Sequence, residues 1–381
     1  MRRFAFLLAM LFSFPAHGQA DAEAQVSPDT VMAQVAEASP LFQRARRTVA
    51  KAIDKLEDAD GRRLTRAALL LQGDCVRHRI GLDRNAQRQI VATLAERGWL
   101  DSKYSTEAGR EEARRLLFPP LVGEDGACPH LTTPELAAAG GNSGSHHSWP
   151  GGLAEHIATN LASGMALVRA YRSEGAEVDG DSVAGAILWH DWAKALVLRW
   201  QADGDTALEL RVAGTGAHHI LGLAEAMKRG LPARWIAAQA CAHAAPDGED
   251  ATRVANWIEA AAVIAGEEPA RFPVSTTPEC LISHMSDQNW VFGDVAVATV
   301  EARLVELAPQ AGFDPLDKTR YRFCYRNAAL AQVGGDALFT LTQSNADSLG
   351  SMPHGNSNHR FWSMNPRVAD VVRTLAFCRR K

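Results

Sequence analysis

The chain has 381 residues, of which 46% are hydrophobic and 22% are charged, so a largely disordered or fibrous protein is excluded. Its 40 basic and 44 acidic side chains give a formal net charge of -4. Because there is no basic excess to hold a phosphate backbone, no nucleic-acid partner is expected. The chain also contains 13 histidines, and their positions carry the functional prediction.

The first 20 residues have the pattern of a secretory signal peptide. Arg2 and Arg3 precede an apolar stretch at 4–14, which is too short to span a bilayer and is ended by Pro15. We therefore expect an exported protein, periplasmic or secreted, with no membrane span once the signal is removed. The alternative is a buried N-terminal helix.

An even number of cysteines follows the predicted signal, and an oxidising compartment would permit them to form disulfides. Their spacing does not determine which residues pair. Cys241 lies in an apolar, alanine-rich run and is expected to be a buried thiol rather than a bridge partner. The six are Cys75, Cys128, Cys241, Cys280, Cys324 and Cys378.

Composition predicts an all-α protein. Residues 30–115 and 151–268 are rich in helix-forming residues, whereas the prolines and glycines of 118–150 indicate a long irregular connection. Residues 207–212 are the best strand candidate, as part of a small hairpin. The predicted organisation is a signal peptide at 1–20, a helical region with an irregular linker at 21–140, a central domain at 141–270, and a helical and loop region at 271–381.

Histidines recur on the inward faces of four predicted helices. His156 adjoins an apolar stripe that starts at Leu153 and repeats every four residues. His219 and His243 group with the apolar residues of their own helices, and His218 can exchange roles with His219. A single histidine of this kind is explained by a satisfied core residue, but four together indicate one shared centre.

The helix predicted around 183–198 places His190, Asp191 and Lys194 on one face of an otherwise apolar segment. A carboxylate buried without a partner is costly, so something must compensate its charge. A divalent metal would do so, because imidazole and carboxylate are both good ligands. The alternative is an internal ion pair from Asp191 to Lys194 or to an arginine.

These segments resemble the HD-domain superfamily of metal-dependent phosphohydrolases. Residues 147–156, HSWPGGLAEH, are similar to its opening element, and residues 187–194, ILWHDWAK, are similar to its central His-Asp element. Residues 217–222, AHHILG, and the pair at 242–243 are similar to its third and fourth elements. The resemblance covers about residues 146–268 and implies an HD-type helical bundle around a divalent ion, which would be Mn, Fe, Ni, Zn or Mg.

The resemblance also implies roles for particular residues. By position, His156, His190 and Asp191 match metal ligands, and Glu267 falls about where the family has a fourth, aspartate ligand. Asp191 would also orient the attacking water, and Lys194 would hold a phosphate charge. A second metal or a phosphate contact is expected from His219, His243, His218 and His147. Because Ala244 stands where two-metal members often carry another histidine, one metal is expected, or one strong and one weak.

The expected function is hydrolysis of a phosphomonoester or phosphodiester by a metal-activated water, with a small phosphorylated substrate such as a nucleotide. Glu267 and Ala244 depart from the family pattern, so the alternative is a catalytically silent HD-like module that binds a metal, a nucleotide or a partner protein. A third possibility is a purely structural helical protein. The polar segment 286–290 is either a source of substrate contacts or a turn with a helix cap.

Overall fold

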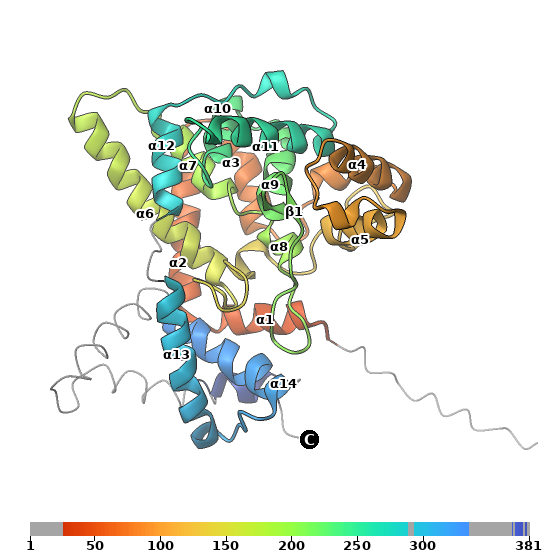
Figure 1. Ribbon diagram of the computed structural model, residues 1–381. Helices are drawn as coiled ribbons and strands as arrows, with labels where there is room; N and C mark the ends of the chain where they lie inside the picture. Colours follow the sequence, from red (N-terminus) through yellow and green to blue (C-terminus); the bar gives the residue numbers. More distant parts are fainter. Residues whose placement is uncertain (1–25, 289–292, 335–367, 369, 376–377, 379–381) are drawn as a thin grey trace, which may run out of the picture.

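Helices dominate the protein, and the all-α prediction is confirmed. A computed structural model describes residues 26–288, 293–334, 368, 370–375 and 378, so the predicted signal peptide lies outside the described part (Figure 1). The helices are α1 (Pro28–Glu37), α2 (Pro40–Asp54), α3 (Ala59–Leu70), α4 (Arg84–Glu96), α5 (Glu107–Leu117), α6 (Gly152–Ser173), α7 (Gly180–Trp189), α8 (Lys194–Val197), α9 (Ala217–Arg229), α10 (Ala233–Ala240), α11 (Asp250–Ala265), α12 (Pro278–Asp287), α13 (Gly293–Leu307) and α14 (Lys318–Arg320).

Short polar side chains start many of these helices. Ser39 caps α2 by accepting hydrogen bonds from two backbone N–H groups, and Pro40 occupies the first helical position. Asp179 caps α7 in the same way, and Thr277 precedes Pro278 at the start of α12. These local signals fix where the helices that carry the candidate site begin.

The largest core is built around α7, which is buried on every side as expected for a helix that is apolar all round. Helices α6, α10 and α12 pack directly against α7, and α2 packs along α6. The same cluster of buried side chains runs from Ala36 to Ile282. The core therefore continues across the predicted domain limits at 141 and 270.

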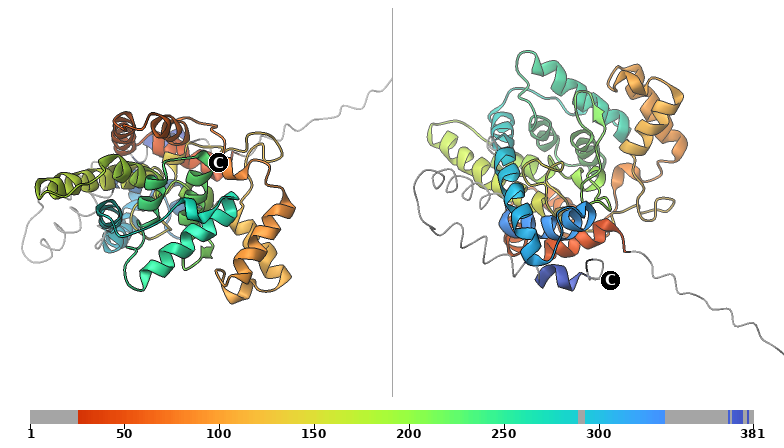
Figure 2. Two further views of the ribbon diagram at one scale, coloured as in Figure 1. Left: turned by 90° about the horizontal axis from the view of Figure 1, so that it is seen from above. Right: turned by 60° about the horizontal axis from the view of Figure 1, so that its bottom comes forward.

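A second, smaller core lies at the other end of the molecule. It joins α1 to α13 and to the helical segment that follows α14 (Figure 2). Buried aromatic side chains, including Phe323 and Tyr325, fill it, and Val368 and Leu375 cover it. The described part of the C-terminal region thus packs against the N-terminal helix.

All six cysteines are paired, so the expectation of a free, buried Cys241 thiol is wrong. Cys241 is fully buried, but it bridges to Cys280 on α12, because their Cα atoms lie 5.2 Å apart. The other pairs are Cys75–Cys128 and Cys324–Cys378. The alanine-rich run around Cys241 correctly indicated burial, but burial does not exclude a partner.

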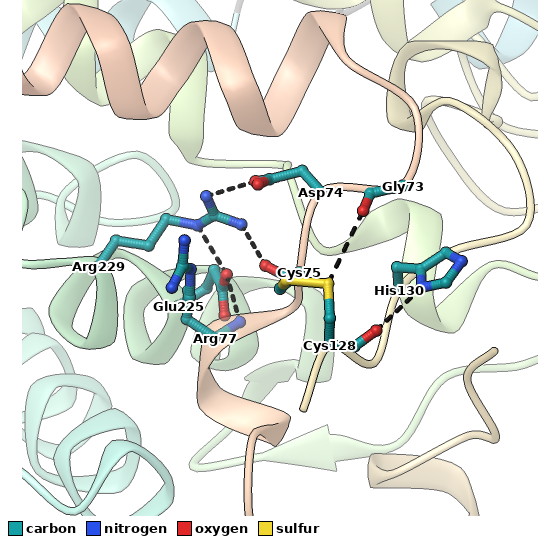
Figure 3. The surroundings of a disulfide bond; sticks show 8 residues. All are labelled: Gly73, Asp74, Cys75, Arg77, Cys128, His130, Glu225 and Arg229. Atoms are coloured by element: carbon teal, nitrogen blue, oxygen red, sulfur yellow. Dashed lines mark hydrogen bonds and ion pairs between the residues drawn. A yellow bond between two sulfur atoms is a disulfide. The ribbon is translucent and has the colours of Figure 1, made fainter. Parts of the chain in front are cut away.

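The Cys75–Cys128 bridge adjoins a buried charge cluster that ties the N-terminal region to α9 (Figure 3). The Arg229 guanidinium donates to Glu225 at 2.7 Å, to Asp74 at 2.6 Å and to the Cys75 carbonyl at 2.7 Å. Although burial opposes it, hydrogen bonding to His78 and the charge of Arg229 lower the pKa of Glu225 to about 2. The carboxylate therefore stays ionised and holds the segment before α4 against α9.

The predicted strand at 207–212 is found only at its end. Strand β1 (Arg211–Val212) pairs antiparallel with β2 (Thr215–Gly216), with Val212 opposite Thr215. This hairpin leads directly into α9. Among the described residues, no helix combines the length and the apolar character needed to cross a membrane.

Candidate metal centre

Four side chains from three elements meet at the centre of the larger core. His156 comes from the first turns of α6, His190 and Asp191 follow the last turn of α7, and Asp287 ends α12. The two imidazoles and the Asp191 side chain are at most 1% exposed, and the Asp287 side chain is 11% exposed. Since all four ligand atoms lie within 4.8 Å of one another, the group could hold one metal ion.

The distances within this group are those of atoms that surround a common point. His156 Nε2 lies 3.0 Å from Asp191 Oδ2 and 3.1 Å from Asp287 Oδ1. His190 Nε2 lies 3.2 Å from each of the same two oxygens. The two Nε2 atoms are themselves 3.2 Å apart. Two ring nitrogens and two carboxylate oxygens form a donor set that suits Zn, Mn, Fe or Ni.

The local hydrogen bonding prepares His190 to be a ligand. Its Nδ1 lies 2.8 Å from the carbonyl oxygen of Ile187, which can only accept, so Nδ1 carries a hydrogen. In the neutral ring, Nε2 then directs its lone pair at the carboxylates, and a backbone carbonyl behind a ligating histidine is the usual arrangement at metal sites. The residues present therefore fit a divalent cation at this point.

Without an ion, a proton would take its place. Although burial opposes it, the charges of Asp191 and Asp287 raise the pKa of His190 to about 10. Although burial opposes it as well, the charges of His190 and Lys194 hold the pKa of Asp191 well below its usual range. The carboxylates are thus ionised, and His190 balances one of their charges when no metal is bound.

This proton predicts a pH dependence of metal binding. Below a pH of about 10, an ion must displace the proton from His190, so the apparent metal affinity should rise with pH, by up to roughly tenfold per unit. Titration of the metal-free protein with Zn²⁺ in two buffers of different ionisation enthalpy should show about one proton released per ion near pH 7. Binding without proton release would contradict the assignment of His190.

A second trio shares Asp191 with the first group. Asp191 Oδ1, His218 and His243 also lie within 4.8 Å of one another. Glu209 lies 2.7 Å from His218 Nδ1 and also accepts the His218 backbone N–H, so His218 Nε2 faces Asp191 Oδ1 at 3.4 Å. That oxygen accepts no hydrogen bond from any residue that the structure describes. The two oxygens of Asp191 therefore point at two adjacent positions, each of which fits a cation.

The trio contains two of the four residues predicted for a second metal or a phosphate contact. His218 and His243 belong to it, whereas His219 is in none of the groups of described residues that could hold an ion. Both ring nitrogens of His219 are buried and make no hydrogen bond with a residue that the structure describes. The His219 ring stacks on His243, with centroids 4.2 Å apart, and meets the edge of Trp257. Burial, together with the nearby His243, holds the pKa of His219 well below its usual range. His219 supports the His243 ring from behind.

Lys194 makes the ion pair that the sequence left open as an alternative. Its ammonium group lies 2.6 Å from Asp191 Oδ2 and donates to the Gly140 carbonyl at 2.5 Å. The side chain is 10% exposed, so the pair is largely buried. An ion pair and a metal-binding group are thus both present at Asp191. Lys194 offsets the charge of Asp191 and leaves that of Asp287.

Glu267 does not belong to the group, and its predicted position as a ligand is corrected. Helix α11 ends at Ala265, and Gly266 after it adopts a left-handed φ of 64°, so the chain turns away there. The Glu267 carboxylate instead pairs with Arg271 on the surface. Asp287 lies where a fourth ligand is needed, although its sequence context, the polar segment 286–290, left its role open.

The assignment of the fourth ligand to Asp287 rather than Glu267 can be tested directly. Asp287→Ala should lower the affinity of the central position for Zn²⁺ by about 100-fold, because one of four ligands is lost. Glu267→Ala should leave that affinity unchanged, because Glu267 pairs with Arg271 instead. Isothermal titration of both variants with Zn²⁺ measures the difference. Equal losses in the two variants would contradict this assignment.

His147 occupies a strained loop next to His156. It has a φ of 56°, a left-handed conformation that is unusual for a residue with a side chain, and it is 1% exposed. Gly152 makes this loop possible, because a Cβ atom there would lie 2.0 Å from the His147 carbonyl oxygen. His146, His147 and His156 could themselves hold an ion. His147 therefore borders the centre.

A helical fold with a buried cluster of histidines and aspartates that could bind a metal is compatible with an HD-type architecture. Comparison with family models, with curated proteins and with solved structures finds no match to this chain.

Proposed function

We propose that the protein is an exported, metal-dependent phosphohydrolase of the HD type, which cleaves a phosphomonoester or phosphodiester. One observation carries the proposal: His156, His190, Asp191 and Asp287 converge on one buried point, and Asp191 also faces a second trio. Paired ion positions that share a carboxylate are typical of sites that act on phosphate esters.

The side chains around the centre suit this chemistry. A bound divalent ion would supply a water of lowered pKa and would polarise a phosphoryl oxygen. Lys194 would hold a phosphate charge if its ammonium group, which lies beside the centre at Asp191 Oδ2, turned toward the substrate. Asp191 would orient the attacking water. The side chains of Asp287 and His243 are the most exposed in the two groups, at 11% and 19%, so the substrate would approach from their side.

The disulfides support export. Three bridges join all six cysteines, and stable disulfides are rare in reducing compartments. A secretory signal at 1–20 would bring the chain to an oxidising compartment, periplasmic or extracellular. Secretion of the full-length chain, with cleavage near residue 20 shown by mass spectrometry, would test this part of the proposal.

A second candidate is a catalytically silent module that binds a metal or a nucleotide. The ion pair favours this candidate, because Lys194 approaches the same Asp191 oxygen that faces His156 and His190. If Lys194 held this place permanently, the central position would bind an ion weakly and would leave no room for a phosphate.

Metal analysis and turnover of the purified mature protein separate these candidates. The enzyme should hold one or two divalent ions and hydrolyse bis-p-nitrophenyl phosphate or p-nitrophenyl phosphate, and His190→Ala should lose the central ion together with turnover. Bound metal without turnover on either ester would favour the silent module. No metal uptake, with unchanged folding of His190→Ala, would leave a structural role.

A further inference from the structure

A groove separate from the metal centre lies between α2, α6 and α7. Its volume is about 470 Å³, within the range of small-molecule sites. It opens beside Gly180 at the start of α7, whereas His190 follows the end of that helix. At 1.5 Å per residue, the two lie about 15 Å apart along the axis. The groove is therefore a second site on the helices that carry the centre.

The floor of the groove is apolar. Leu56, Leu161 and Ala184 line it and are buried in the main core, and Met165 lies half-buried beside them. Leu161 and Met165 are one helical turn apart on α6, so they form a continuous surface along that helix. Such a floor fits an alkyl chain or a ring rather than a bare ion.

Cationic side chains form the rim. Lys51 and Lys55 come from α2, and Arg169 and Arg172 come from α6. The Arg172 guanidinium is held in place, because it donates twice to the Val178 carbonyl, at 3.1 and 2.6 Å. The other three cations make no ion pair with any residue that the structure describes, whereas the neighbouring Arg66 on α3 pairs with Asp54.

The acidic residues at the groove are largely engaged elsewhere. Asp179 accepts from the Ser182 hydroxyl at 2.6 Å and pairs with Arg234 at 2.8 Å. Asp181 accepts the backbone N–H of Glu57 at 2.7 Å and also that of the next residue. Among the described residues that line the groove, Glu57 is the acid without an ion-pair partner. The groove is thus lined by four cations and three carboxylates, and Lys51, Lys55 and Arg169 make no ion pair with a described residue.

We propose that this groove binds a small organic anion that has an apolar body, such as a medium-chain carboxylate or alkyl phosphate. The apolar part lies on Leu161 and Met165, and the anionic head meets Lys51, Lys55 and Arg169. Inorganic phosphate would gain only the charge contacts, and an alcohol of equal length would gain only the apolar ones.

Isothermal titration of the full chain with four probes tests the groove. Octanoate and octyl phosphate should bind with one molecule per chain, and whichever binds more tightly identifies the preferred head group. Octanol and inorganic phosphate should each bind at least about tenfold more weakly. Absence of octanoate and octyl phosphate binding up to about 1 mM, or equally tight binding of octanol, would overturn the proposal.

Charge reversal locates the site. The double variant Lys51→Glu, Arg169→Glu should weaken binding of the tighter anion by about tenfold or more. Arg115→Glu is the matched control, because Arg115 is an exposed cation on α5 that makes no ion pair with a described residue and does not line the groove. Unchanged binding in the double variant would overturn the assignment. Because the groove needs no metal, the result holds whether or not the centre binds an ion.

Discussion

Asp191→Asn is expected to remove both ions from the protein at once. Each oxygen of Asp191 faces a different group, so the substitution weakens both positions, by about 100-fold or more for the tighter one. Hydrolysis of a chromogenic phosphodiester should fall by at least about 1000-fold, because the water loses both its activation and its orientation. Metal content after gel filtration and steady-state rates measure the two effects.

His218→Ala is the matched control for this prediction. His218 belongs only to the second trio, so its loss should remove the second ion and leave the central one. Asp191→Asn also leaves Lys194 without its carboxylate, so thermal unfolding must show that the variant is folded under the assay conditions. Two ions retained by folded Asp191→Asn would contradict the shared role of this carboxylate.

Removal of the Cys241–Cys280 bridge is expected to lower the free energy of unfolding by about 4 kcal/mol. The two cysteines are separated by 39 residues, and the loss of loop closure in the unfolded chain accounts for this amount. The bridge also joins the end of α10 to α12, next to His243 on one side and on the helix of Asp287 on the other. The Cys241→Ser, Cys280→Ser variant should therefore bind metal more weakly as well.

The Cys324–Cys378 bridge serves as a control that separates the loss of stability from the loss of metal affinity. The Cys324→Ser, Cys378→Ser variant should lose a similar free energy of unfolding, because these two cysteines are 54 residues apart. Their bridge, however, lies in the second core. Chemical denaturation gives the stability of both variants, and zinc titration gives their affinities. The prediction fails if both variants bind metal equally well, because the first bridge would then have no role in placing Asp287.

The sequence predicted the part of the centre that depends on helix periodicity. His156 follows the apolar stripe of α6, and His190 with Asp191 follows a helix that is apolar throughout, so these residues had to face inward. The choice between His218 and His219 could not be made in this way. Adjacent residues differ by about 100° on a helix, and Glu209 in the preceding loop orients His218.

Asp287 was missed because its surroundings resemble a helix end. It follows Ser286 and precedes two polar residues, which is also the composition of a turn with a cap. The structure shows that Ile282 and Ser286, four residues apart, are both buried, so the last turn of α12 faces the core. Glu267 was preferred by spacing alone, and Gly266, which ends α11, was the local evidence against it.

Because Asp287 lies on α12, its place in the centre limits how far the chain can be shortened. A fragment that stops at residue 270 would lack α12, one of the four converging ligands and a cysteine that Cys241 requires. A fragment that starts at residue 141 would lack Thr65, whose hydroxyl accepts the indole N–H of Trp189 immediately before His190. The smallest piece worth expressing therefore spans α2 to α12, and a fragment cut at residues 141 and 270 should yield insoluble material.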